Sequence, residues 1–293
     1  MLSILIPTFN YNAYPLVSEL NRQAEKENIP FEILCYDDGS TLEVEQNQKI
    51  NSLRHCSHES FKKNIGRVAL RNKLAEAARF EWLLFLDSDV FPRKNNFISL
   101  YIDKISNTSK KIIFGGICYE ESNSNQNLRH YYGTHREQKK TFLKKNSSLQ
   151  FIVSANMVID KNVFLSTNTV LENKYGMDCV MSAEIDKQNI DFIHISNEVY
   201  HLGLESNEIF LKKSKESAFT IRWLYENNLI TEKQSQLIVA HKWLKKWRVV
   251  KLFSLFGSVV EGSVERLLEK NKVPLVFFDF FRLYHYVTSK GVQ

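Results

Sequence analysis

The sequence predicts an α/β fold: a doubly wound, mostly parallel sheet followed by a helical C-terminal extension. Short apolar runs alternate with helical patterns over residues 1–206, and this alternation indicates a sheet built from βαβ units. The run WLLFL at residues 82–86 is continuously apolar and too short for an ordinary helix, which is typical of a strand buried on both faces. A length of 293 residues and a hydrophobic content of 43% are enough for a substantial core.

Taken in order, the first part of the chain holds predicted strands at residues 2–7, 31–36, 54–56 and 82–86. The helices between them are predicted at residues 12–26, 42–53 and 67–79. We expect Asn12 to cap the first of these helices, and the motif Asn64-Ile65-Gly66 to open the third.

The second part begins with a predicted helix near residues 95–105 and continues with strands at 112–117, 151–159, 192–195 and 199–203. Tyr175-Gly176-Met177-Asp178 opens another helix, which runs to about residue 186. From residue 207 onward the pattern is helical and contains no Gly/Pro linker. We therefore divide the chain into a sheet domain, residues 1–206, and a helical extension, residues 207–293, which is basic and aromatic from about residue 241.

The net charge of +6 is unevenly distributed. Residues 241–293 hold ten Lys/Arg and four Asp/Glu, a surplus of six, so the first 240 residues are neutral. A neutral sheet domain without a basic stripe argues against nucleic acid as a partner. In the tail, basic residues together with Trp243, Trp247 and the run VPLVFFDFF at residues 273–281 leave two interpretations open. The tail is either an interfacial element on an anionic membrane surface or a packing element on the sheet domain.

The cysteines and the apolar runs indicate in which cellular compartment the protein is expected. Four cysteines are scattered without C-x-x-C spacing, which favours a reducing environment and neither a disulfide framework nor a zinc site. No apolar run reaches the roughly 20 residues that span a bilayer, and SILIP follows the first two residues in place of a signal peptide. We expect a cytoplasmic protein, peripheral on the inner face of the plasma membrane if the tail binds lipid.

Polar turns follow three predicted strands, at residues 8–12, 37–41 and 87–89. Because the carboxyl ends of parallel strands meet at one edge of a sheet, these turns are expected to form a ligand site. No glycine-rich phosphate loop is present, so a divalent cation is the natural partner for a phosphorylated ligand. Asp87 and Asp89 offer the carboxylate oxygens that Mg²⁺ or Mn²⁺ prefers. An isolated D-x-D is more often a loop acid followed by a helix cap, and the other two turns favour the ligand site.

Four segments, in order and spacing, resemble the motifs of family 2 glycosyltransferases, which have the GT-A fold: IPTFN at 6–10, DDGS at 37–40, NIGRVALRN at 64–72 and LDSD at 86–89. The resemblance covers roughly residues 1–205. It implies a nucleotide-diphospho-sugar donor, with a UDP-sugar as first choice, Mn²⁺ or Mg²⁺ on a D-x-D acid, and inversion at the anomeric carbon. It places donor binding at Pro7, Thr8, Asn10, Asp38, Asn64, Gly66, Arg71, Asp87 and Ser88. Within this set Asp38 is expected at the nucleoside and Asp87 at the ribose.

The same resemblance suggests the remaining site residues. Related enzymes carry an acidic pair at the start of a helix. Here Met177 occupies the position of the first acid, so Asp178 is the candidate general base. Glu184 is the fallback, and the competing interpretation of Asp178 is an acid stabilised by the helix dipole. His201 resembles a histidine that helps bind the metal beside Asp89, whereas His194 is expected to be a core residue.

The function expected from these observations is transfer of a sugar to a carbohydrate or lipid-linked acceptor in cell-surface polysaccharide synthesis. One alternative is a non-catalytic nucleotide-sugar-binding or scaffolding protein of the same fold, suggested by Met177. Another is a sugar-nucleotide nucleotidyltransferase, whose glycine-rich loop is missing from residues 6–12.

Overall fold

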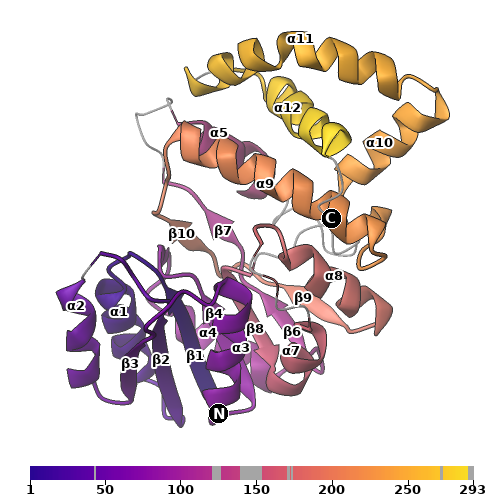
Figure 1. Ribbon diagram of the computed structural model, residues 1–293. Helices are drawn as coiled ribbons and strands as arrows, with labels where there is room; N and C mark the ends of the chain where they lie inside the picture. Colours follow the sequence, from indigo (N-terminus) through magenta and orange to yellow (C-terminus); the bar gives the residue numbers. More distant parts are fainter. Residues whose placement is uncertain are drawn as a thin grey trace.

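The computed structural model describes residues 1–42, 44–120, 127–138, 154–169, 172, 174–270 and 273–289. Residues 151–153, the start of one predicted strand, lie outside these ranges. The predicted α/β architecture is confirmed (Figure 1).

A seven-stranded sheet in the order β3-β2-β1-β4-β8-β6-β9 forms the centre of the molecule. The strands are β1 (Leu2–Thr8), β2 (Phe31–Asp37), β3 (Cys56–Ser60), β4 (Trp82–Leu86), β6 (Ile112–Phe114), β8 (Asn156–Asp160) and β9 (Phe192–His194). All neighbouring pairs are parallel except those of β8, which runs antiparallel to β4 and β6. The strand β1 therefore lies between β2 and β4, with Leu2 opposite both Phe31 and Trp82.

The strand β4 is buried on both faces, as its continuous apolar run predicts. Leu84 and Leu86 belong to one core cluster, together with side chains of α1 (Tyr14–Ala24) and α4 (Phe97–Ser106). Leu83 and Phe85 belong to a second cluster, with side chains of α3 (Arg67–Ala77), α7 (Lys161–Thr167) and α8 (Asp178–Lys187). Alternate side chains of a strand point to opposite faces, so helices cover the sheet on both sides.

A second sheet of three short strands arises where one predicted strand is broken. The sequence predicts one strand at 112–117, but β6 ends at Phe114, and Ile117–Cys118 forms β7 in another sheet. The chain turns at Gly115-Gly116, and Gly116 has a φ of 86°, which glycine adopts without strain. The small sheet has the order β5-β10-β7, with β5 at Val90–Pro92 and β10 at Val199–His201.

Three predicted boundaries near the N-terminus were wrong. The first helix begins at Tyr14, and Asn12 lies outside it, accepting the Tyr14 N–H through its side chain at 3.2 Å. The second helix is only α2 (Glu45–Gln48), because Val44 is not helical, and a 3₁₀ turn, η1 (Lys49–Ser52), follows. The third strand starts at Cys56 because His55 takes a left-handed φ of 60°.

The predicted helical extension packs on the sheet domain rather than standing apart. It contains α9 (Asn207–Glu226), the 3₁₀ turn η3 (Glu232–Gln234), α10 (Gln236–Lys246), α11 (Val250–Glu269) and α12 (Leu275–Thr288). Figure 1 shows α9, α11 and α12 stacked above the sheet, next to α5 (Leu128–Tyr132), which continues as a π-helix, η2 (Gly133–Gln138). Met177 and Val180 at the start of α8 share one apolar cluster with Ile221 of α9, Ile238 of α10 and Tyr286 of α12.

The run at 273–281 is mostly a packing element. Val273, Phe278 and Phe281 are buried in a cluster with α9 and α11, while Val276 and Phe277 are exposed. For this run the burial favours the packing interpretation, apart from the two exposed side chains. In the described part of the chain no helix combines the length and the apolar character that a membrane span requires.

Candidate functional site

The three predicted polar turns meet at one edge of the sheet, as expected from neighbouring parallel strands. The turn after β1 touches the turn after β2, where the Asp38 N–H donates to the Thr8 carbonyl at 2.9 Å. Asn10 joins them further, because its side-chain oxygen accepts the backbone N–H groups of Thr41 and Leu42 at 2.8 and 2.9 Å. Pro7 and Thr8 lie at the end of β1, just before this junction.

Asp38 holds the loop that precedes α3. Its two carboxylate oxygens accept the backbone N–H groups of Ile65 at 2.7 Å and Gly66 at 3.0 Å. Burial raises the pKa of Asp38, although these two hydrogen bonds oppose the rise. The side chain is therefore committed to positioning the Asn64–Gly66 segment, and its predicted contact with a nucleoside stays a prediction.

The first two turns of α3 present arginine side chains to Asp87. Arg67 donates to both carboxylate oxygens of Asp87, at 2.9 and 2.7 Å, and Arg71 donates to one of them at 2.7 Å. Burial alone would raise the pKa of Asp87, but the two guanidinium groups outweigh it and hold that pKa below its usual value. Asp87 therefore stays ionised and orients a pair of cations at the edge of the sheet.

Asp89 and His201 are brought together by the small sheet. Val90 of β5 pairs with His201 of β10, and this register places His201 Nε2 at 3.4 Å from Asp89 Oδ2. Gly203 allows the approach, because a Cβ atom there would lie 2.3 Å from the same Oδ2. His201 is nearly buried, and its ring packs edge-on against Tyr119 at 5.7 Å.

The Asp89–His201 pair fits a divalent cation. Neighbouring ligand atoms of an octahedral ion lie about 3 Å apart, because each is about 2.1 Å from the ion. The observed 3.4 Å is close to that spacing, and carboxylate and imidazole are both ligands of Mn²⁺. Among the described residues no group of three or more metal-binding side chains occurs. A cation here would therefore take its other ligands from phosphate oxygens and water, as Mg²⁺ usually does.

Asp178 occupies the first position of α8 and faces the same arginines. Its Oδ1 accepts the Ser154 hydroxyl at 3.2 Å and lies 3.8 Å from Arg71 Nη1. The carboxylate is 44% exposed, which leaves it accessible to a hydroxyl group of an incoming molecule. Glu184 lies six residues further along α8 and pairs with Lys187 at 3.2 Å. A rise of about 9 Å along the helix separates the two, so Asp178 is the better placed acid.

The position of Met177 explains why no acid precedes Asp178. The Met177 side chain is 5% exposed and lies in the apolar cluster with Ala218 and Ile221 of α9. A carboxylate there would lose its hydration without gaining a cation, which costs several kcal/mol or forces the group to stay neutral.

We expect Met177→Glu to lower the free energy of unfolding by about 3 kcal/mol or more, because it buries an unpaired charge. Met177→Leu, which conserves volume, should cost less than about 1.5 kcal/mol. Urea unfolding of both variants measures the difference. Equal stability of the two would show that the side chain at 177 turns out of the cluster.

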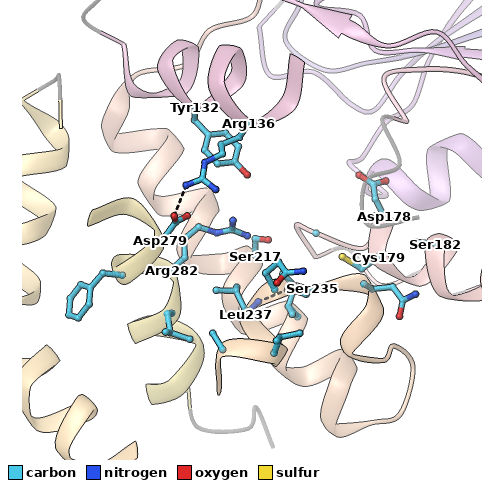
Figure 2. Close-up of a pocket in the computed structure, with 18 of the residues that line it drawn as sticks. Tyr132, Arg136, Asp178, Cys179, Ser182, Ser217, Ser235, Leu237, Asp279 and Arg282 are labelled. Atoms are coloured by element: carbon cyan, nitrogen blue, oxygen red, sulfur yellow. Dashed lines mark hydrogen bonds and ion pairs between the residues drawn. The ribbon is translucent and has the colours of Figure 1, made fainter. Parts of the chain in front are cut away.

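A cavity of about 870 Å³ opens beside Asp178. Figure 2 shows Asp178 and Cys179 on one side of it and the ion pair between Arg136 and Asp279, at 2.7 Å, on the other. Arg282 also lines this cavity, and no carboxylate of the described chain forms an ion pair with it. The remaining wall comes from α9, α10 and α12 and is largely apolar. The helical extension thus completes a cavity that begins at an acid of the sheet domain.

The structure therefore places most of the predicted residues at one edge, with Ser88 between Asp87 and Asp89. His194 is partly buried and stacks on Phe114 at 5.0 Å, at the edge of the core. Arg67 and Ser154 were missed by the sequence analysis. Arg67 directly follows the Asn64-x-Gly66 motif at the helix start, and this position was the available signal.

Comparisons with known proteins identify the family and the fold. The family model described as "Glycosyl transferase family 2" matches residues 3–166, more than half of the chain. No curated protein matches the sequence.

Several solved structures share the fold. S. aureus TarS residues 1–349 in complex with UDP is 16% identical, with a TM-score of 0.54 over 98% of this chain and 89% of that one. Another TarS crystal structure is 18% identical, with a TM-score of 0.53 over 76% of this chain. The present chain spans only 39% of the length of that TarS chain. The mannosyltransferase PcManGT from Pyrobaculum calidifontis, in complex with GDP-Man and Mn²⁺, is 11% identical with a TM-score of 0.55, over 98% of this chain and 84% of that one. At such identities the likeness shows the fold, and it confirms the GT-A resemblance.

Proposed function

We propose that this chain, which belongs to glycosyl transferase family 2, is a nucleotide-sugar glycosyltransferase that depends on a metal and inverts the anomeric carbon. In this proposal the donor is a UDP-sugar and the acceptor is a carbohydrate or a lipid-linked molecule of cell-surface polysaccharide synthesis. The cytoplasmic location expected from the sequence stays a prediction.

The donor diphosphate is assigned to the edge between Asp87 and His201. Asp89 and His201 would hold Mn²⁺ or Mg²⁺, which neutralises charge on the leaving diphosphate when bound. Arg67 and Arg71 supply further positive charge next to this position, and Asp87 fixes their orientation. Fixed charges of this kind lower the barrier because they need no reorganisation during the reaction.

Asp178 is assigned as the general base. As the acceptor oxygen attacks the anomeric carbon, the hydroxyl proton passes to the Asp178 carboxylate, and the bond from that carbon to the diphosphate oxygen breaks. The diphosphate leaves with the bonding electron pair. Attack from the face opposite the leaving group inverts the configuration at this carbon.

The observation that carries the proposal is the contact of Arg71 with both acids, at 2.7 Å to Asp87 and 3.8 Å to Asp178. One buried cation thus lies between the edge assigned to the donor and the group assigned as base. In the proposal, Arg71 sets the distance between the bound donor and the acceptor hydroxyl.

We expect one nucleotide sugar of a UDP- and GDP-linked panel to stabilise the protein only when Mn²⁺ is present. A ligand at 100-fold its Kd adds about 2.7 kcal/mol to the free energy of unfolding. For a protein of this size that raises Tm by about 4 °C. Thermal unfolding with Mn²⁺ and with EDTA measures it, and a panel without any metal-dependent shift would contradict the proposal.

The scaffolding alternative predicts binding without turnover. Burial of Met177 removes its main support, because the missing first acid is explained by packing against α9. Release of UDP or GDP from the stabilising donor, followed with Mn²⁺ present, separates the two functions.

A further inference from the structure

An apolar surface is exposed on α11. Leu252, Leu255, Phe256 and Val259 are 66%, 67%, 58% and 78% exposed. Their spacing is that of the stripe by which an amphipathic helix normally faces its core. Trp243 and Trp247, at the end of the preceding helix α10, are 58% and 61% exposed, and their rings lie 6.2 Å apart. We call these six side chains the α10–α11 face.

The packing of α11 shows that this face is not the side by which the helix contacts the core. Gly257, Val264 and Leu268 are the buried residues of α11, and the ring of Tyr284 of α12 would lie 2.3 Å from a Cβ atom at Gly257. The inner side of α11 therefore packs against α12. Figure 1 shows α11 as the outermost helix, with α12 on its inner side. Within the described chain, the ring of Phe256 meets that of Phe280 of α12 edge-on, with centroids 6.1 Å apart, and all six side chains of the α10–α11 face remain more than half exposed.

The charges around this face are mostly positive, with Glu232 and Glu261 just outside the range that holds it. Residues 233–260 contain six Lys/Arg and no Asp or Glu. Lys242 pairs with Glu232, whereas Lys245, Lys246, Arg248 and Lys251 are exposed and form no ion pair with a described carboxylate. The partner of the face should accordingly be apolar and negatively charged.

A lipid bilayer with anionic headgroups has both properties. Exposed leucine and phenylalanine enter the boundary of acyl chains and headgroups, tryptophan prefers the same depth, and nearby lysines attract anionic lipid. A second copy of the chain fits less well, because it would bring the same cations together and lysine is depleted from protein interfaces.

The cavity beside Asp178 reaches this region. Val239, Trp243 and Val276 line the cavity, and all three are exposed to solvent as well. The cavity wall also contains Ile221, Leu237 and Leu283, which suit a hydrocarbon chain. Arg282, without a described carboxylate partner, suits a phosphate group in the same cavity.

We propose that the protein docks on an anionic bilayer through the α10–α11 face and that the adjoining cavity takes an acceptor carried on a lipid phosphate. The docking half is independent of the proposed enzymatic function. The acceptor half rests on it, because it makes Asp178 the base for that acceptor.

Flotation of the full chain with vesicles tests the docking half. We expect binding to vesicles of equal parts phosphatidylglycerol and phosphatidylcholine, and much weaker binding to phosphatidylcholine alone. Raising the salt from 0.1 to 1 M should weaken binding, because the Debye length falls from about 10 to about 3 Å. Equal, negligible binding to both vesicles at low salt would overturn the proposal.

Variants locate the surface. Leu255→Ser with Phe256→Ser should weaken vesicle binding by about 10-fold or more, since two apolar side chains leave the lipid. Leu165→Ser with Ile209→Ser, which alters two other exposed apolar side chains on α7 and α9, should bind like the original chain. Equal losses in both double variants would overturn the assignment to this face. Sedimentation that shows a dimer of the original chain and a monomer of the first double variant would also overturn it, because a second copy of the chain would then cover the face.

Calorimetry with farnesyl phosphate, below its micelle concentration, tests the acceptor half. We expect saturable binding that Arg282→Gln weakens by about 10-fold, because a charge-assisted contact to phosphate is lost. Arg266→Gln, on the exposed side of α11, is the matched control. Absent binding, or equal effects of the two variants, would overturn this half. Release of UDP or GDP from a nucleotide sugar, followed with Mn²⁺ present, tells independently whether the transferase function stands.

Discussion

Replacing Asp178 by asparagine is expected to reduce sugar transfer by about 100-fold or more, while donor affinity stays within a few-fold. The amide keeps the shape of the side chain and still accepts the Ser154 hydroxyl, now 3.2 Å from Asp178 Oδ1. It cannot take the proton of an acceptor hydroxyl. Steady-state transfer rates, together with calorimetric titration of the donor, separate the loss of proton transfer from a loss of binding.

The matched control lies on the same helix. Glu184→Gln also removes one carboxylate from α8, but Glu184 pairs with Lys187 away from the arginines, so transfer should be nearly unchanged. If the two results were exchanged, with Glu184→Gln inactive and Asp178→Asn active, the base would be Glu184. Comparable activity of both variants would place the base outside α8.

Replacing Asp89 by alanine is expected to remove metal-dependent donor binding and turnover without unfolding the protein. Changing a residue that only supports a metal ligand already costs about 10- to 100-fold in metal affinity, so loss of a ligand should cost at least that much. The fold should persist because the backbone carbonyl of Asp89 accepts the Leu202 N–H at 2.8 Å, and alanine keeps this hydrogen bond. Donor titrations with Mn²⁺ measure the effect.

Chelation provides the comparison for Asp89→Ala. EDTA should bring the original chain to the donor affinity of the variant and should leave the variant unchanged. Asp103→Ala, at an exposed position of α4, serves as a control for the loss of one negative charge. An Asp89→Ala protein that still binds donor in an EDTA-sensitive way would disprove the metal role of this carboxylate.

The parts of the fold that the sequence predicts are those dictated by local composition. Trp82–Leu86 could be identified as a central strand because burial on both faces leaves an unbroken apolar run. The break at Gly115-Gly116 was signalled by the glycine pair, which commonly marks a turn, but the apolar residues on either side favoured one continuous strand. The exposed stripe of α11 was missed for a related reason. Its spacing is that of a core-facing helix, and the pattern does not say which side is covered.

The candidate site divides in the same way. Convergence of the strand ends follows from parallel topology, so the meeting of the polar turns was predictable. The hydrogen bonds of Asp38 were not predictable, because its partners Ile65 and Gly66 are 27 and 28 residues away and nothing in either motif shows that the two segments touch. Arg67 was overlooked because a charged residue at the start of a helix usually faces solvent. Here Asp87, 20 residues on, draws it to the edge of the sheet.

The apolar cluster that joins Met177 and Val180 to α9, α10 and α12 has a consequence for how the enzyme can vary. Asp178 stands between these two side chains in sequence, so the orientation of its carboxylate depends on helices that follow residue 206. A truncated chain would expose the cluster and release the start of α8 together with Asp178. Under the proposed function, the segment that lines the acceptor cavity and the segment that carries the base are thus parts of one cooperative unit. Exchanging the extension between homologous proteins would therefore change catalytic rate along with specificity, unless the residues that meet Met177 and Val180 were exchanged with it.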